Sequence, residues 1–120
     1  MHRGPERRVH RTRNKQLAIE YFLQGCILRM GIRGLVLGTR DGLLIATAGG
    51  GVEAESAAAF APFVFHDAWD FPESVEDAYF VDAIPLADTT LYLFVVGHSG
   101  RATPTSQQTK TGIRRILDES

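Results

Sequence analysis

A tight turn in the first half of the chain limits the folds that are open to it. Two short apolar runs, residues 35–37 and 43–45, lie on either side of the dipeptide Asp41-Gly42. Aspartate followed by glycine favours the positive backbone angles of a tight hairpin, because glycine has no Cβ that would clash in that conformation. The two runs are therefore predicted to pair as antiparallel strands, with Asp41 and Gly42 as the structural turn.

A long helix is predicted before this hairpin, because apolar side chains recur with the period of one helix face. Asn14 is suited to cap the helix, and Gly31 follows its last apolar residue. The apolar face consists of Ile19, Phe22, Leu23, Cys26, Ile27 and Met30. Leu17, Tyr21 and Leu28 widen this face, so the helix is predicted to contact a second surface besides its own sheet.

A second helix is predicted after the hairpin. Three glycines at 49–51 form a sharp turn, and an alanine-rich helix is expected to begin near Val52. Pro62 has no amide hydrogen and clashes with the preceding turn, so this helix is predicted to end or kink near Ala61.

The second half of the chain contains two further strand signals, at 79–86 and 90–97, and a last helix that begins near Thr103. Pro85 indicates either an edge position or a bulge for the first of these strands. Taken together, the elements predict an α+β fold with an antiparallel sheet of four or five strands and helices on both faces, in the order α-β-β-α-β-β(-β)-α.

The charges of the chain are unevenly distributed. Residues 1–15 hold six Arg and Lys side chains against one Glu, a balance of +5, so the remaining residues carry −6 to give the net charge of −1. Residues 1–13 are almost without apolar side chains and are predicted to be a flexible basic arm, with the folded domain over 14–120. One alternative makes this arm a tether to nucleic acid or another anionic surface.

Composition excludes several other classes of protein. With 44% hydrophobic and 22% charged residues in 120, the chain fits one globular domain and not a disordered protein. Its apolar runs are far shorter than the ~20 residues that cross a bilayer, so we expect no transmembrane segment and a cytoplasmic location. The single cysteine, Cys26, cannot form an internal disulfide and is predicted to be a core residue.

The hairpin and the second helix resemble a known family. The segment GLVLGTRDGLLIA at 34–46, followed by a glycine turn and AESAAAFA at 54–61, is similar to the roadblock family, which comprises the roadblock-type dynein light chains and bacterial GTPase regulators. The resemblance covers roughly residues 15–118. It implies a five-stranded antiparallel sheet with the first and third helices on one face and the second helix on the other.

The resemblance also implies a function. Roadblock domains dimerise through sheet edges and the second helix, and they act as platforms for small Ras-like GTPases, either as scaffolds or as activators of GTP hydrolysis. They have no chemistry or cofactor of their own. The implied homodimer or heterodimer contacts are Ala54, Ala57, Ala58 and Ala61, and Arg40 at the hairpin tip is a candidate for a direct contribution to GTP hydrolysis.

Aromatic residues are concentrated after the second helix. Seven of the eleven aromatic side chains lie between Phe60 and Phe80, next to several carboxylates. They form either a lid over the core with a solvated acidic edge, or a surface that binds a basic partner. Phe65 and Trp69 are the predicted partner contacts under the second interpretation.

Three other features of the sequence bear on possible ligand binding or catalysis. Residues Gly49–Ala54 fit the G-x-G-x-x-A pattern, so the alternative function is a sensor that binds a nucleotide or small ligand there; that pattern requires a parallel strand–helix–strand unit. His98-Ser99 lacks the spacing of a nucleophile elbow, and the four histidines show no metal-ligand spacing. We therefore predict no catalytic, cofactor or metal site, and a non-enzymatic protein.

Overall fold

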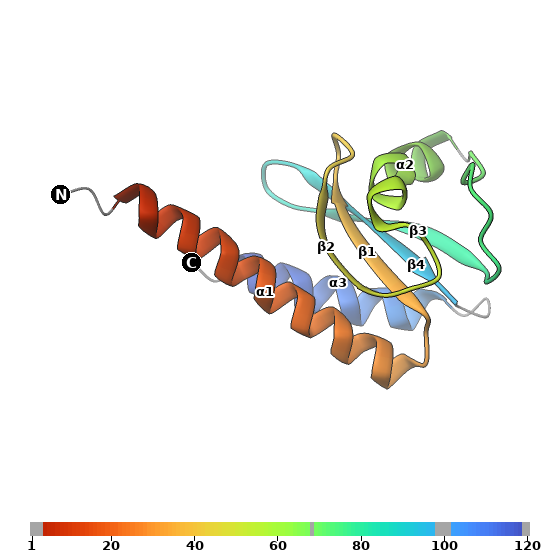
Figure 1. Ribbon diagram of the computed structural model, residues 1–120, viewed down its shortest axis with the longest axis horizontal. Helices are drawn as coiled ribbons and strands as arrows, with labels where there is room; N and C mark the ends of the chain where they lie inside the picture. Colours follow the sequence, from red (N-terminus) through yellow and green to blue (C-terminus); the bar gives the residue numbers. More distant parts are fainter. Residues whose placement is uncertain (1–3, 68, 98–101, 119–120) are drawn as a thin grey trace.

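The computed structural model describes the backbone of residues 4–67, 69–97 and 102–118, and the side chains of residues 14–67, 69–97 and 107–118. Within these residues, three helices and four strands follow one another in the order α-β-β-α-β-β-α (Figure 1). Their bounds are α1 Gly4–Met30, β1 Gly34–Thr39, β2 Leu44–Gly49, α2 Ala54–Asp67, β3 Tyr79–Pro85, β4 Thr90–Val96 and α3 Ala102–Asp118. This order confirms the predicted α+β class.

The predicted hairpin is present, and all pairs in the sheet are antiparallel. The strand order is β2-β1-β4-β3. In the turn between β1 and β2, the Gly42 amide donates to the Thr39 carbonyl at 3.0 Å, and Gly42 has a φ of 85°. The turn therefore has Arg40 and Asp41 at its centre, and Gly42 supplies the positive φ, as in a three-residue hairpin loop.

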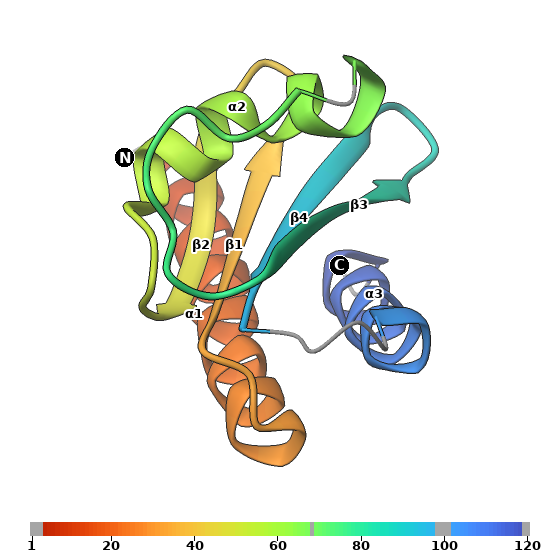
Figure 2. The same ribbon diagram turned by 90° about the vertical axis from the view of Figure 1, so that its right-hand side faces the viewer.

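The helices cover both faces of the sheet, as predicted. α1 and α3 lie on one face and α2 lies on the other (Figure 2). The alternation of side chains along β1 explains the two layers: Leu35 and Leu37 join the core beneath α1 and α3, whereas Val36 joins the core beneath α2. The α2 core also contains Ala57, Ala58, Ala61, Phe71, Tyr92, Phe94 and Val96.

The number of strands decides between the two predicted sheets. The described residues form a four-stranded sheet, so the five strands implied by the family resemblance are not formed there and the four-stranded alternative is confirmed. Residues 69–78 form no strand because Phe71 is buried in the α2 core and Pro72 has no amide hydrogen for a sheet ladder. β3 is consequently an edge strand, which confirms the first of the two alternatives indicated by Pro85.

Two helix boundaries differ from the predictions. α1 begins at Gly4 and not at Asn14, so it includes most of the predicted arm; extending a helix that has already formed adds one hydrogen bond for each residue that is fixed. α2 continues through Pro62 to Asp67, so the first of the two predicted alternatives, an end near Ala61, is wrong. Side chains beyond the proline pack on β4, and these contacts offset the backbone hydrogen bond that Pro62 removes.

Candidate functional site

The aromatic segment at 60–80 divides between core and surface. Phe71 is buried, and its ring meets that of Phe94 edge-on at 5.1 Å between centroids. The Tyr79 ring stacks on that of Phe94, 5.2 Å away, and the Tyr79 hydroxyl accepts a hydrogen bond of 2.8 Å from the Phe71 amide. The lid interpretation is therefore correct for Phe71 and Tyr79.

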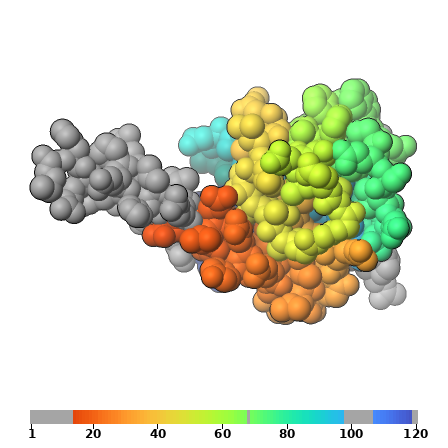
Figure 3. Space-filling view, in the orientation of Figure 1, coloured from red at the N-terminus to blue at the C-terminus, as the bar shows by residue number. Residues whose placement is uncertain are grey.

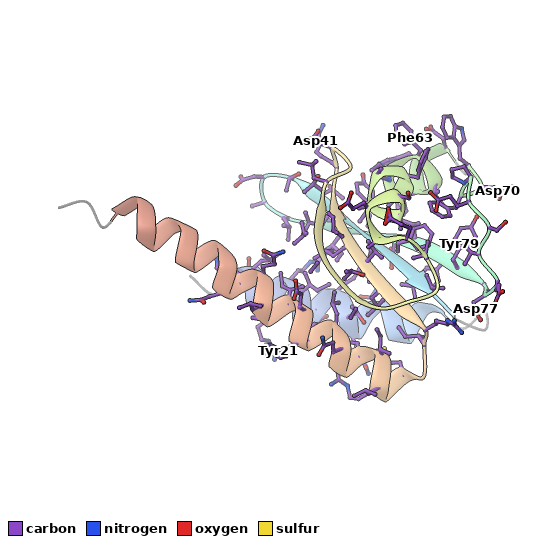
Figure 4. All side chains as sticks on the ribbon, in the orientation of Figure 1. Tyr21, Asp41, Phe63, Asp70, Asp77 and Tyr79 are labelled. Atoms are coloured by element: carbon purple, nitrogen blue, oxygen red, sulfur yellow. The ribbon has the colours of Figure 1, made fainter. Side chains whose placement is uncertain are left out.

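The other half of the segment is exposed at the C-terminal end of α2. Phe63, Phe65 and Trp69, which we call the aromatic surface, are 45%, 41% and 54% exposed. The Phe63 and Trp69 rings stack 5.3 Å apart with an interplanar angle of 18°. Figure 4 shows Phe63 on the outer side of α2, away from the sheet. Exposed, mutually stacked rings of this size are a common feature of protein-binding surfaces, so this half has the exposure that the binding-surface interpretation requires, and that interpretation stays a prediction.

A hollow of about 390 Å³ lies beside these rings. It is lined by Arg40, Pro62, His66, Thr90 and Tyr92, so the β1–β2 hairpin, α2 and the start of β4 all contribute to it. The ring nitrogen of His66 and the hydroxyl of Tyr92 form a hydrogen bond. Figure 3 shows the hairpin tip and α2 together along one border of the molecule, away from α1.

Arg40 brings a positive charge to the hollow. It is exposed, and within the described residues its guanidinium has no ion-pair partner. Asp67, the last residue of α2, and Asp70 beyond it are exposed as well. A cation, two hydrogen-bonding groups and apolar rings in one place are suited to recognising a protein surface, with the charges setting orientation and association rate.

The predicted contact alanines lie elsewhere. Ala57, Ala58 and Ala61 are at most 1% exposed, because β1 and β4 of the same chain cover them. A Cβ placed on Gly38 of β1 would lie 3.0 Å from the Cβ of Ala58, so helix and sheet approach as closely as small residues allow. Ala54 is half-buried at the start of the helix. The exposed large apolar side chains of α2, Phe63 and Phe65, lie instead near its C-terminal end.

Phe63, His66 and Tyr92 belong to this site but were absent from the predicted contacts. Phe63 and His66 lie beyond Pro62, where the sequence predicts an end or kink of the helix. The helix continues past Pro62 to include His66. The apolar side chains that follow the proline, Phe63 and Phe65, were the sequence signal for this continuation. Tyr92 reads as an ordinary strand residue, so only the packing of β4 against α2 identifies it.

The glycine-rich loop between β2 and α2 has a structural role. Gly49 and Gly51 have φ angles of 74° and 91°, and the Gly50 amide donates to the Arg33 carbonyl at 3.0 Å. The amides at the start of α2 are occupied as well, because a Glu53 carboxylate oxygen accepts from the Glu55 amide at 2.7 Å. A phosphate would have to displace this carboxylate, and the antiparallel sheet lacks the parallel unit that the nucleotide motif requires.

Cys26, His98 and Ser99 are the other residues that the sequence analysis weighed as chemical groups. Cys26 is fully buried, as predicted, and Arg29 donates to its sulfur at 3.4 Å. His98 and Ser99 lie outside the described residues. Over the described part of the chain, no three His, Cys, Asp or Glu side chains are placed to hold a metal ion. In the same part, no helix has the length and hydropathy to cross a membrane.

Comparison with known proteins identifies the fold. No protein-family model matches the chain, and no curated protein matches it by sequence. Its structure is similar to that of Myxococcus xanthus MglB, with a TM-score of 0.58 over 85% of this chain and 89% of that one, at 12% sequence identity. The three helices and the four-stranded antiparallel sheet match the roadblock-like fold of that protein.

Proposed function

We propose that this chain is a dimeric, non-enzymatic cytoplasmic regulator that binds a small Ras-like GTPase through its aromatic surface and Arg40. Two independent similarities support the proposal: the sequence resemblance to roadblock domains, and the roadblock-like fold shared with MglB. The observation that carries it is the stacked, exposed Phe63–Trp69 pair on α2, a helix that shares a hollow with Arg40, whose guanidinium has no ion-pair partner among the described residues.

The expected mechanism is recognition without covalent chemistry. Phosphoryl transfer depends on positioning and charge stabilisation, so a bound regulator can accelerate hydrolysis by ordering the residues of the GTPase. If Arg40 acts directly on the nucleotide, Arg40→Ala will abolish stimulation of hydrolysis at saturating regulator. If Arg40 only contributes to binding, the same variant will weaken affinity and leave the saturated rate unchanged.

A binding titration tests the proposal. Candidate Ras-like GTPases, each loaded with GDP or a GTP analogue, are titrated with the full chain, and we expect one nucleotide state to bind more tightly. Trp69→Ala should weaken that binding, whereas Tyr21→Ala removes an aromatic side chain that is 72% exposed on α1 and should not. Equal binding of both nucleotide states across the panel, or full affinity in Trp69→Ala, would contradict the proposal.

The alternative functions predict different results. A nucleotide sensor that uses Gly49–Ala54 would melt at a higher temperature with saturating nucleotide, because a ligand that binds only the native state stabilises it. We expect no such shift, since Glu53 caps the helix that follows the loop. A tether formed by residues 1–13 would bind anionic polymers or vesicles in a salt-sensitive way and lose this binding on truncation.

A further inference from the structure

We propose that Asp82 closes the C-terminal half of the free β3 edge to strand pairing, so that a strand of a second copy of this chain can pair only with Tyr79 and Val81. β3 is the last strand in the sheet order, and Figure 2 shows it at the side of the sheet opposite β2. The free edge of a sheet offers unpaired amides and carbonyls to any other strand, and native proteins commonly block it. The proposal concerns this edge and does not depend on GTPase binding.

The hydrogen bonds at the two ends of β3 show which of its residues face the free edge. At one end, the Gly97 amide donates to the Ala78 carbonyl at 2.7 Å; at the other, the Leu86 amide donates to the Thr89 carbonyl at 2.8 Å. Both bonds extend the β3–β4 register by one residue, so the even-numbered residues of β3 bond to β4. The amides and carbonyls of the alternate residues point outward, and these residues are Tyr79, Val81, Ala83 and Pro85.

Only two of these four outward positions have an amide that is available to another strand. Pro85 has no amide hydrogen. The Ala83 amide donates to Oδ1 of Asp82 at 2.9 Å, which also shows that it does not bond to β4. Within the described residues, the amides of Tyr79 and Val81 have no partner. The C-terminal half of the edge therefore offers carbonyls without donors, whereas an antiparallel ladder needs both.

A second contact holds the Asp82 carboxylate in this position. Its Oδ2 atom lies 3.2 Å from Nζ of Lys110 on α3, and the two side chains are 26% and 14% exposed, respectively. The carboxylate thus joins the edge amide to the neighbouring helix. Displacing it to free Ala83 would leave the largely buried Lys110 ammonium without its counterion, which is unfavourable because a buried charge needs a partner.

The same carboxylate opposes the longest possible pairing with a second copy. Two β3 strands that pair antiparallel along their whole length are centred on residue 82, since β3 spans Tyr79–Pro85. Asp82 of one copy then lies directly opposite Asp82 of the other, with Cα atoms about 4.5 Å apart. Like charges in this arrangement destabilise a strand pair. A pair centred on Phe80 avoids the contact and uses only the amides and carbonyls of Tyr79 and Val81.

This restriction is compatible with the sheet-edge dimer that the roadblock resemblance implies, and it limits where the contact can lie. At the other edge of the sheet, Ile45 of β2 is a bulged residue without a partner in the β1 register, and its carbonyl accepts from Gln16 of α1 at 3.0 Å. A bulge and a covering helix both protect an edge. We therefore expect a sheet-edge contact at Tyr79 and Val81, whose side chains pack against the α2 core.

Removing the carboxylate tests the proposal. The double variant Asp82→Ala/Lys110→Met frees the Ala83 amide without leaving a buried ammonium unpaired, and Lys110→Met alone is the matched control that keeps the carboxylate. In sedimentation velocity, we expect the double variant to self-associate at least tenfold more tightly than the control or the unaltered chain, because the whole length of β3 can then pair. Equal self-association of the double variant and Lys110→Met would overturn the proposal.

Amide hydrogen exchange separates an opened edge from a general loosening of α3. At concentrations below the onset of association, we expect the Ala83 amide to exchange at least tenfold faster in the double variant than in Lys110→Met. The Ile84 amide bonds to β4 and should exchange equally in both. Unchanged exchange at Ala83, or an equal increase at Ala83 and Ile84, would overturn the role of Asp82. Neither experiment involves a GTPase, so both outcomes leave the proposed function standing.

Discussion

Two aromatic residues that are two positions apart should respond in opposite ways to truncation. Phe71 is 6% exposed and contacts the rings of Phe60, Tyr79 and Phe94, whereas Trp69 is 54% exposed and stacks on Phe63. Buried Phe→Ala changes cost about 3–5 kcal/mol. Since Phe71 lies in a connecting segment that can partly collapse into the space, we expect Phe71→Ala to lower the free energy of unfolding by about 3 kcal/mol.

Trp69→Ala removes one stacking contact at the surface, so we expect a loss of about 1 kcal/mol or less in the free energy of unfolding. Its effect on partner binding should be larger. Complete burial of the exposed 54% of a side chain with an area of about 250 Å² removes about 135 Å² from water, which corresponds to about 3 kcal/mol at about 25 cal/mol per Å². This is the size of a binding hot spot and equals a loss of about 100-fold in affinity.

Urea unfolding followed by far-UV circular dichroism measures both stabilities. Fluorescence is unsuitable because Trp69 is the single tryptophan of the chain. For a domain of this size, the loss in Phe71→Ala corresponds to a fall in Tm of about 10 °C or more. Comparable destabilisation by the two variants would refute the division of this segment into a core half and a surface half.

Three further changes test local features of the fold. Glu53→Ala removes the carboxylate that caps α2 and should cost about 1 kcal/mol in urea unfolding; no loss would show that the cap is unimportant. Gly42→Val places a Cβ 3.2 Å from the backbone of Ala59 at a φ of 85°, so we expect a lower Tm by several degrees, and an unchanged Tm would contradict the turn geometry. Pro62→Ala restores a helix amide and should raise stability by about 1 kcal/mol; a decrease would mean that the proline ring itself supports the fold.

Part of the candidate site could be predicted from the sequence. The turn residues place Arg40 at a hairpin tip, and the composition of residues 60–80 shows a concentration of aromatic rings. Only the structure shows that Arg40 and α2 line one hollow. What periodicity could not determine is which of these rings face water. Phe71 and Trp69 have nearly the same local sequence context, and only the contact of Phe71 with Phe94, which is distant in the sequence, separates their roles.

The sequence by itself determined the features that depend only on residues close together in the chain. The Asp41-Gly42 turn, the end of α1 at Gly31 with its φ of 64°, and the edge position marked by Pro85 each follow from backbone geometry within a few residues. Tertiary structure decided the features that depend on distant segments. α2 passes through Pro62 because rings beyond it pack on β4, and residues 69–78 form no strand because Phe71 packs on Phe94 in the α2 core. Such contacts are set by the whole packed chain, and no short window of sequence contains them.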